Sequence, residues 1–221
     1  MMSFMWAVGI NQTSSILFAT PIALGGYGFG PTSLGYLFFT PLVAVFIGES
    51  FGHFFNDFVA NRYIRTHGGV FKPEARLWPM YIAGGLMVPG LILVGQALFH
   101  HLHWVAIVFG WGMYVVGCLI ASVAITAYAL DSYPTASGEV SGLINFARII
   151  GKLPFENCPT LLLTSTGGFS VGYFQLDWGK KNGFDVSFGV QGGLVAVALI
   201  IIVCLHIFGG RMRAKGGPLK T

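Results

Sequence analysis

Charged residues are scarce in this sequence. Asp, Glu, Lys and Arg make up 9% of its 221 residues and hydrophobic residues 54%, whereas about a quarter of a typical soluble domain is charged. The mean hydropathy is +0.72. A soluble core could not bury so many long apolar runs, which excludes a soluble domain and any Ser-His-Asp or Cys-His arrangement within one. The composition predicts an all-α integral membrane protein that is not an enzyme.

Cysteine pairs and a removable leader are also missing. The three cysteines, Cys118, Cys158 and Cys204, have neither paired nor Cys-x-x-Cys spacing, which argues against a disulfide framework and against a zinc site. The first residues lack the charged start, short apolar core and cleavage site of a signal peptide. We therefore expect them to stay in the mature chain.

Two short stretches imitate ligand-binding motifs. Three histidines fall in one short external loop without acidic or cysteine partners, at His100, His101 and His103. They predict a wet membrane rim rather than a metal site. The stretch "GGYGFG" at 25–30 follows no strand and precedes no lysine, so it predicts a flexible turn rather than a phosphate loop. Neither stretch indicates a metal or another cofactor.

Long apolar runs predict the membrane spans. A helix needs about 20 apolar residues to cross about 30 Å of hydrocarbon. Five windows qualify directly: 3–25, 34–55, 78–98, 104–127 and 188–208. The basic residues of the segment 61–76 and of the tail 209–221 place both in the cytoplasm by the positive-inside rule. The net charge of +4 thus reflects topology and does not indicate nucleic acid.

Because 61–76 and the tail both lie in the cytoplasm, the chain must cross the membrane an even number of times between them. Only three of the windows follow 61–76, so a further span must lie within 137–174. This fifth span is interrupted by a 16-residue insert, 152–167, which contains Lys152, Glu156 and two prolines. Without the insert, 22 residues remain, and these form about 33 Å of helix. The sequence therefore predicts six transmembrane helices, the fifth of them interrupted.

The insert has the coding character of a retained intron. Gly151 and Lys152 can be encoded by GGTAAG, which contains a splice donor, and 163–167 by CTGACATCTACAGGC, which contains a branch-like CTGAC and an AG acceptor. We expect a gene model that is truncated at its start and retains this intron. The alternative is a real loop that breaks the helix, as in the discontinuous helices of some transporters.

Three stretches resemble a known family. "GESFGHFFNDFVANRYIRTHGGVFKPEARLW" (48–78), "ITAYALDSYPTASGEVSGLINFARIIG" (125–151) and "GGFSVGYFQLDWGKKNGFDVSFGVQ" (167–191) resemble the C-terminal half of fungal major facilitator superfamily transporters, in the drug:proton antiporter-like branch. The resemblance implies two six-helix halves, with these spans as helices seven to twelve. It also implies proton-coupled export of a small molecule by alternating access, in the plasma membrane, together with a missing N-terminal half.

Polar residues inside spans are candidates for substrate or proton binding, because such residues usually face a cavity. Glu49 and His53 share one helix face. Alternatively, Glu49 lies shallow and pairs with Arg62 or with a neighbouring helix in a structural role. The other candidates are Asn11, Gln12, Asn145 and Arg148. Asn11 and Gln12 either line the cavity or bond across helices, and Arg148 either binds substrate or locks its helix to a neighbour.

A charged cytoplasmic loop is the second candidate site. It contains Asp57, Arg62, Arg65, Glu74 and Arg76. The loop loosely resembles the gating loop of the superfamily, whose ion pairs hold one conformation closed, although its spacing departs from the usual pattern. The plain alternative is a solvated positive-inside loop.

Two other functions remain open at this stage. One is a six-span membrane protein that does not transport and acts as a regulatory or assembly partner in the lipid bilayer. The other is a half-size transporter that works as a homodimer.

Overall fold

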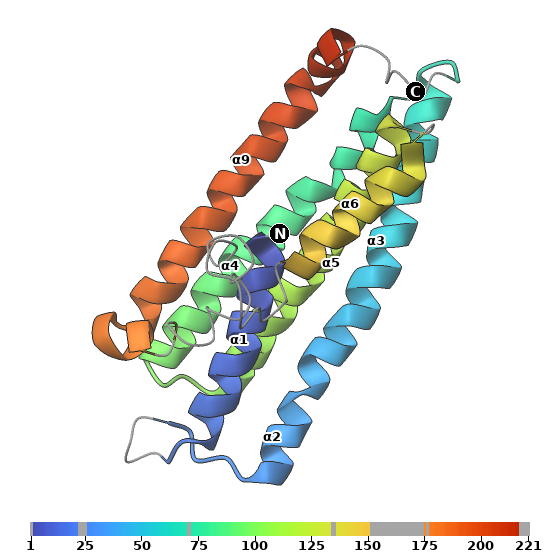
Figure 1. Cartoon of the computed structure of the whole chain (residues 1–221). Helices are drawn as coiled ribbons and strands as arrows, with labels where there is room; N and C mark the ends of the chain where they lie inside the picture. Colours follow the sequence, from blue (N-terminus) through green and yellow to red (C-terminus); the bar gives the residue numbers. More distant parts are fainter. Residues whose placement is uncertain are drawn as a thin grey trace.

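The computed structural model describes residues 2–21, 26–69, 72–133, 136–150, 175 and 177–216, and in this part of the chain it is all-helical. The predicted all-α class is therefore confirmed. The elements in chain order are α1 (Met2–Ala19), α2 (Pro31–Leu37), α3 (Phe39–Thr66), the 3₁₀ helix η2 (Pro73–Leu77), α4 (Pro79–Phe99), α5 (Trp104–Ser132), α6 (Ser137–Ile150) and α9 (Phe184–Gly216). The long helices lie side by side with their axes roughly aligned, and consecutive helices α4 and α5 run antiparallel (Figure 1).

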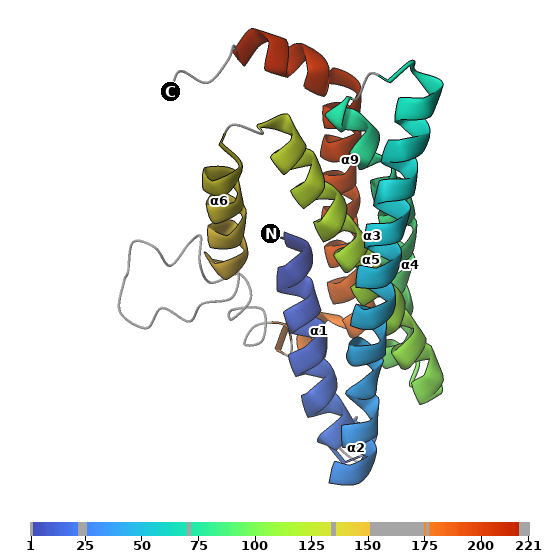
Figure 2. The same cartoon turned by 90° about the vertical axis from the view of Figure 1, so that its right-hand side faces the viewer.

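Helix α5 lies at the centre of the bundle and packs against α3 and α4, while α4 also packs against α9. Figure 2 shows α6 apart from the other helices, beside one end of α5. Helices α4 and α5 approach closely where two glycines meet. A Cβ on Gly90 would lie 2.9 Å from the Gly110 carbonyl oxygen, and one on Gly110 would lie 3.0 Å from the Gly90 oxygen. Small residues of this kind let membrane helices pack at backbone contact.

Helix α3 contacts the bundle along a single face. Its buried residues recur every four positions, and all are small: Ala44, Gly48, Gly52, Asn56 and Ala60. A Cβ on Gly48 would lie 3.0 Å from the Leu119 Cβ, so this row lies directly on α5. Large apolar side chains on the other faces are open, with Phe46 78% and Phe54 80% exposed. Helix α3 therefore needs a lipid or protein environment outside this bundle.

Within the described residues, four helical segments are long and apolar enough to cross a membrane: Pro31–Thr66, Pro73–Phe99, Trp104–Ser132 and Phe184–Gly209. Helix α1 is not among them, because the polar residues 11–15 interrupt its apolar sequence. Helix α6 has 14 residues, or about 21 Å, which is too short to cross alone. The insert 152–167 lies outside the described residues, so the count of six spans stays a prediction.

Two predicted loop segments are helical instead. Helix α3 continues through Asp57, Arg62 and Arg65 and ends at Thr66, so these residues do not share a loop with Glu74 and Arg76 of η2. Gly68 and Gly69 have φ values of +63° and +89°, and this left-handed backbone ends the helix. Helix α9 extends to Gly216 and so includes most of the predicted basic tail. Lysine, arginine and alanine favour helix, which explains the extension.

The predicted flexible turn at 25–30 is held in place where the structure describes it. The Tyr27 hydroxyl donates to the carbonyl oxygens of Ala97 and Leu102, at 3.1 and 3.3 Å. The backbone amide of Phe29 donates to the Phe18 carbonyl at 2.8 Å. Burial raises the pKa of the Tyr27 hydroxyl. This turn therefore joins the end of α1 to the connection between α4 and α5.

Candidate functional site

Arg76 is the centre of an ion-pair cluster at one end of the bundle. Its Nη1 lies 3.2 Å from Oδ1 of Asp57 in α3, and its Nε donates to Oδ2 of Asp131 in α5. The Arg76 side chain is only 20% exposed. A planar guanidinium can serve two carboxylates at once. The cluster therefore joins η2, α3 and α5.

The local sequence explains the position of Arg76. Pro73 begins the 3₁₀ helix "PEARL", and its buried residues Ala75 and Leu77 anchor it to the bundle. Arg76 lies between these two anchors. Asp131 lies in the last turn of α5, and sequence reasoning missed it. The available signal was topological: α5 runs antiparallel to α4, so its end returns to the level at which α4 begins.

The other predicted members of the charged loop lie on different elements, with Glu74 on η2 and Arg62 and Arg65 on α3. Glu74 lies on η2, and a Cβ on Gly209 would lie 3.6 Å from its Oε1, so Glu74 is close to α9. Arg62 and Arg65 are exposed on the last turns of α3. Within the described part of the chain neither forms an ion pair. The loop prediction thus combined residues that occupy different places.

The side chains of Glu49 and His53 lie next to each other on α3. The Oε2 of Glu49 lies 3.6 Å from the Nε2 of His53, and the side chains are 47% and 70% exposed. The alternative partner predicted for Glu49 was Arg62, and the recorded partner is His53. An exposed pair of this kind contributes little to stability. Neither side chain lines the groove between α3 and α5 described below.

The remaining predicted cavity residues are dispersed. Asn11 lies exposed on α1 and Asn145 lies exposed on α6. Gln12 and Arg148 belong to these same helices, but their side chains lie outside the described part. Apart from Glu49 with His53, the structure describes no contact that brings the six candidates together. Their role as a binding site remains a prediction.

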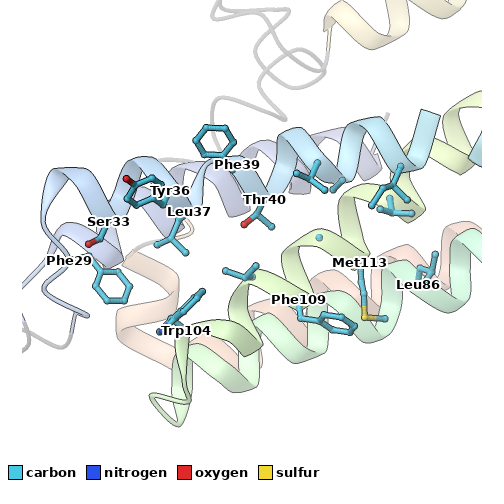
Figure 3. Close-up of a pocket in the computed structure, with 16 residues that line it drawn as sticks. Phe29, Ser33, Tyr36, Leu37, Phe39, Thr40, Leu86, Trp104, Phe109 and Met113 are labelled. Atoms are coloured by element: carbon cyan, nitrogen blue, oxygen red, sulfur yellow. The ribbon is translucent and has the colours of Figure 1, made fainter. Parts of the chain in front are cut away.

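A large groove separates the first half of α3 from α5 (Figure 3). It has a volume of about 880 Å³. One wall comes from α2 and α3 and the other from α5, with Leu37 and Thr40 pointing across the gap (Figure 3). The lining residues are Phe29, Ser33, Tyr36, Leu37, Phe39, Thr40, Val43, Ala44, Ile47, Leu86, Trp104, Val108, Phe109, Gly112, Met113 and Val116.

The lining of the groove suits an uncharged lipophilic ligand. None of its lining residues is charged, and its polar groups are the hydroxyls of Ser33, Tyr36 and Thr40 and the indole of Trp104. Apolar walls with a few polar groups are typical of small-molecule sites. The groove was not predicted from the sequence. Only polar residues within spans were taken as site candidates, and an apolar residue that lines a groove looks the same in the sequence as one that faces lipid. The grouped aromatic residues were the available signal.

The predicted histidine rim consists of exposed residues between α4 and α5. The His103 Nδ1 accepts from the Val105 backbone amide at 3.4 Å and so caps α5. The ring of His101 lies 5.9 Å from that of Tyr27. These contacts give two of the histidines structural roles at this end of the bundle.

Sequence comparisons identify several relatives of this chain. No protein-family model matches the chain, and no solved structure matches it significantly. The Saccharomyces cerevisiae protein named "Probable drug/proton antiporter YHK8" is 24% identical over 190 residues, which cover 86% of this chain and 34% of the relative. The "MFS-type transporter tndD" of Aspergillus flavipes is 27% identical over 85% of this chain and 32% of the relative.

A third relative, the "MFS-type transporter penM" of Penicillium rubens, is 23% identical over 93% of this chain and 42% of its own length. The chain spans about a third of the length of the first two relatives, and the match lies in their C-terminal region. The resemblance to fungal transporters is thus confirmed. Together with its four apolar helices, it makes the chain an integral multi-pass membrane protein.

Proposed function

We propose that the chain forms the C-terminal six-helix half of a major facilitator superfamily transporter. The complete transporter would export a small molecule by alternating access, with the two halves rocking against each other. In this proposal the six spans correspond to helices seven to twelve, and 152–167 interrupts the eleventh. The relatives' names and the similarity over most of the chain support the proposal.

One structural observation carries the mechanism. The groove lies between residues 33–47 and 104–116, whereas the Arg76 cluster joins α3 to α5 near Asp57 and Asp131. Asp57 follows Ile47 by ten positions on α3, or about 15 Å of helix. A bundle that is tied at one end and open at the other suits a protein that opens to one side of the membrane at a time. We assign the tied end to the cytoplasm, following the charge distribution.

Proton coupling would fall to Glu49 and His53. Both side chains are substantially exposed here, and in a complete transporter the opposite six-helix half would cover this face of α3. Covering would desolvate the pair and bring its ionisation under the control of the conformation. The groove hydroxyls would orient an uncharged substrate. A plasma membrane location completes the proposal.

The first test is the sequence of the mature transcript, read across the codons for 145–175 and upstream of the codon for Met1. We expect the codons for 152–167 to be absent and the upstream reading frame to encode the other six-helix half. If the upstream frame contains no apolar spans, the two-half proposal fails. The half-size homodimer and the non-transporting membrane protein would then remain.

The second test is transport by the product of that transcript in proteoliposomes. With an imposed pH gradient, we expect accumulation of an uncharged lipophilic dye, and Glu49→Gln should abolish its dependence on the gradient. The matched control is Gln96→Glu on α4, which introduces a carboxylate outside the Glu49 and His53 pair. Transport that is identical with and without the gradient would exclude proton coupling.

A further inference from the structure

The groove between α3 and α5 differs in chemistry between its two ends. Its polar side chains all lie toward one end, at Ser33, Tyr36, Thr40 and Trp104. Beyond Thr40 on α3 and beyond Trp104 on α5, no lining residue has a polar side chain. Figure 3 shows Ser33 and Trp104 at one end of the groove and Met113 at the other. A ligand that fills the groove therefore needs one polar end and one apolar end.

The two walls run in the same direction along the groove. A Cβ on Gly112 would lie 3.7 Å from Cγ2 of Thr40, and one on Gly48 would lie 3.2 Å from Cα of Val116. On α2 and α3, Ile47 follows Ser33 by 14 positions, or about 21 Å of helix. The groove therefore extends from its polar end well into a hydrocarbon layer about 30 Å thick.

The hydroxyl groups at the polar end are available to a ligand. Elsewhere in the bundle, the Thr126 hydroxyl donates to the Ser122 carbonyl of its own helix at 2.8 Å. For Ser33, Tyr36 and Thr40, by contrast, the described part of the chain contains no side-chain hydrogen bond. A hydroxyl both donates and accepts hydrogen bonds. This end is therefore suited to bind a hydroxyl of the ligand.

The polar end has the composition of a membrane surface. Tyr36 is 71% exposed, and Trp104, the first residue of α5, is 44% exposed. Tryptophan and tyrosine gather where the hydrocarbon meets the head groups. Farther along, Ile47 and Phe109 are 52% and 64% exposed, so both lips of the groove are apolar and open to their surroundings. A lipid could therefore enter the groove from the side with its polar group at the surface.

Aromatic and aliphatic side chains also follow an order along the groove. The aromatic residues lie from the polar end to the middle: Phe29, Tyr36, Phe39, Trp104 and Phe109. The other end is aliphatic, with Val43, Ala44, Ile47, Leu86, Met113 and Val116. Between them, Gly112 leaves room across from Thr40. A hydroxyl, then a flat ring system, then a branched hydrocarbon tail is the ligand that matches this order.

We propose that the groove binds a sterol from the outer leaflet of the membrane, opposite the tied end of the bundle. The sterol hydroxyl bonds the hydroxyl groups at the polar end, the rings lie against the aromatic residues, and the tail reaches Ile47 and Val116. This inference rests on the proposed role of the groove as the binding site, and it names the class of molecule that the site takes.

The first test is a fluorescence titration of the purified chain in detergent with dehydroergosterol, a fluorescent sterol that accepts excitation energy from tryptophan. Trp104 lines the groove, so binding should produce saturable energy transfer. Cholestanol should displace the probe at about fivefold lower concentration than cholestane, which lacks the hydroxyl. This difference is the expected size for one neutral hydrogen bond.

The hydroxyl groups are tested by a triple variant, Ser33→Ala with Tyr36→Phe and Thr40→Val, which removes them with little change in volume. It should bind cholestanol and cholestane equally, whereas the control Thr126→Val should keep the fivefold preference. Circular dichroism and size exclusion should show that both variants fold. Equal displacement by the two steroids in the wild-type chain overturns the proposal, and so does an undiminished preference in the triple variant.

The orientation is tested with two photoreactive sterols, one with a diazirine in the ring system and one with a diazirine at the end of the tail. The first should label residues 33–40 and the second residues 43–47, as read by mass spectrometry of the peptides. The reverse order overturns the proposal. If a lipophilic dye binds in the groove but no sterol does, this inference alone fails. Sterol binding by a chain whose complete transcript product does not transport would support this inference and refute the proposed function.

Discussion

Asp131 holds Arg76 from the more buried side of the ion-pair cluster, and Asp57 holds it from the open side. The Asp131 side chain is 29% exposed and that of Asp57 is 69% exposed. Removing water strengthens an ion pair and raises the cost of leaving one charge without its partner. The contact of Arg76 with Asp131, which joins η2 to the end of α5, should therefore be stronger than its contact with Asp57.

The first prediction concerns this cluster. Asp131→Asn should lower the free energy of unfolding by about 1–3 kcal/mol, because the half-buried guanidinium loses a charged hydrogen-bond partner. Asp57→Asn should cost less, since water already screens that carboxylate. Thermal unfolding in detergent measures both, with Arg62→Gln as the control. An equal cost for the two aspartates would contradict the ranking.

The second prediction concerns the contact between α4 and α5. Gly90→Ala should destabilise the bundle by about 1–3 kcal/mol, because its Cβ would meet the backbone of α5, which cannot move aside. Gly193→Ala on α9 meets nothing within 4 Å and should leave stability unchanged or slightly raised, since alanine favours helix. The thermal unfolding midpoint distinguishes them. Equal midpoints would show that the two helices do not pack at backbone contact.

The third prediction concerns the groove between α3 and α5. Gly112→Leu should fill it, because the nearest atom to a Cβ at this position is the Thr40 Cγ2, at 3.7 Å. We expect about tenfold weaker binding of an uncharged lipophilic dye, or about 1.4 kcal/mol, by fluorescence titration. Gly189→Leu on α9 is the control, since it also faces open space. The same loss of binding in both variants would place the dye elsewhere.

The fourth prediction concerns the turn at Tyr27. Tyr27→Phe should cost about 1 kcal/mol, since the hydroxyl donates to two carbonyl groups. Burial raises the pKa of Tyr27 in the folded state, so the unfolded chain loses this proton at lower pH. Its contribution is therefore complete below the ordinary tyrosine pKa and declines as the pH rises through the folded value.

Thermal unfolding at about pH 8 and above about pH 10 measures this effect. The wild-type chain should lose more stability between the two conditions than Tyr27→Phe does. An identical loss in both proteins would show that Tyr27 does not titrate differently on folding.

Several elements followed directly from the sequence. The expected spans 78–98 and 104–127 correspond to α4, Pro79–Phe99, and to the first part of α5, Trp104–Ser132. Both helices begin where an apolar run follows a polar segment, so hydropathy alone locates them. The end of α3 was harder to predict, because water can satisfy polar side chains on a helix as well as in a loop. Helix α3 therefore continues past its apolar run.

The candidate site was less predictable than the fold. Arg76 was identified from its charge, but its partner Asp131 required knowledge of which helix ends meet. The groove contains no charge, so no polar motif indicated it. Glu49 and His53 were predicted as a pair from their spacing, and they do contact each other. The partners of this exposed face belong to the surrounding lipid or protein, and the sequence of one chain does not specify them.

The buried row on α3 has a geometric consequence. Residues four apart form a ridge that is inclined to the helix axis, so a helix that packs along Ala44, Gly48, Gly52, Asn56 and Ala60 is expected to cross its neighbour rather than run parallel to it. Crossing helices diverge with distance from the point of closest approach. The width of the opening between α2, α3 and α5 is then set by a four-residue repeat of small side chains, of which only Ala44 lines the groove itself.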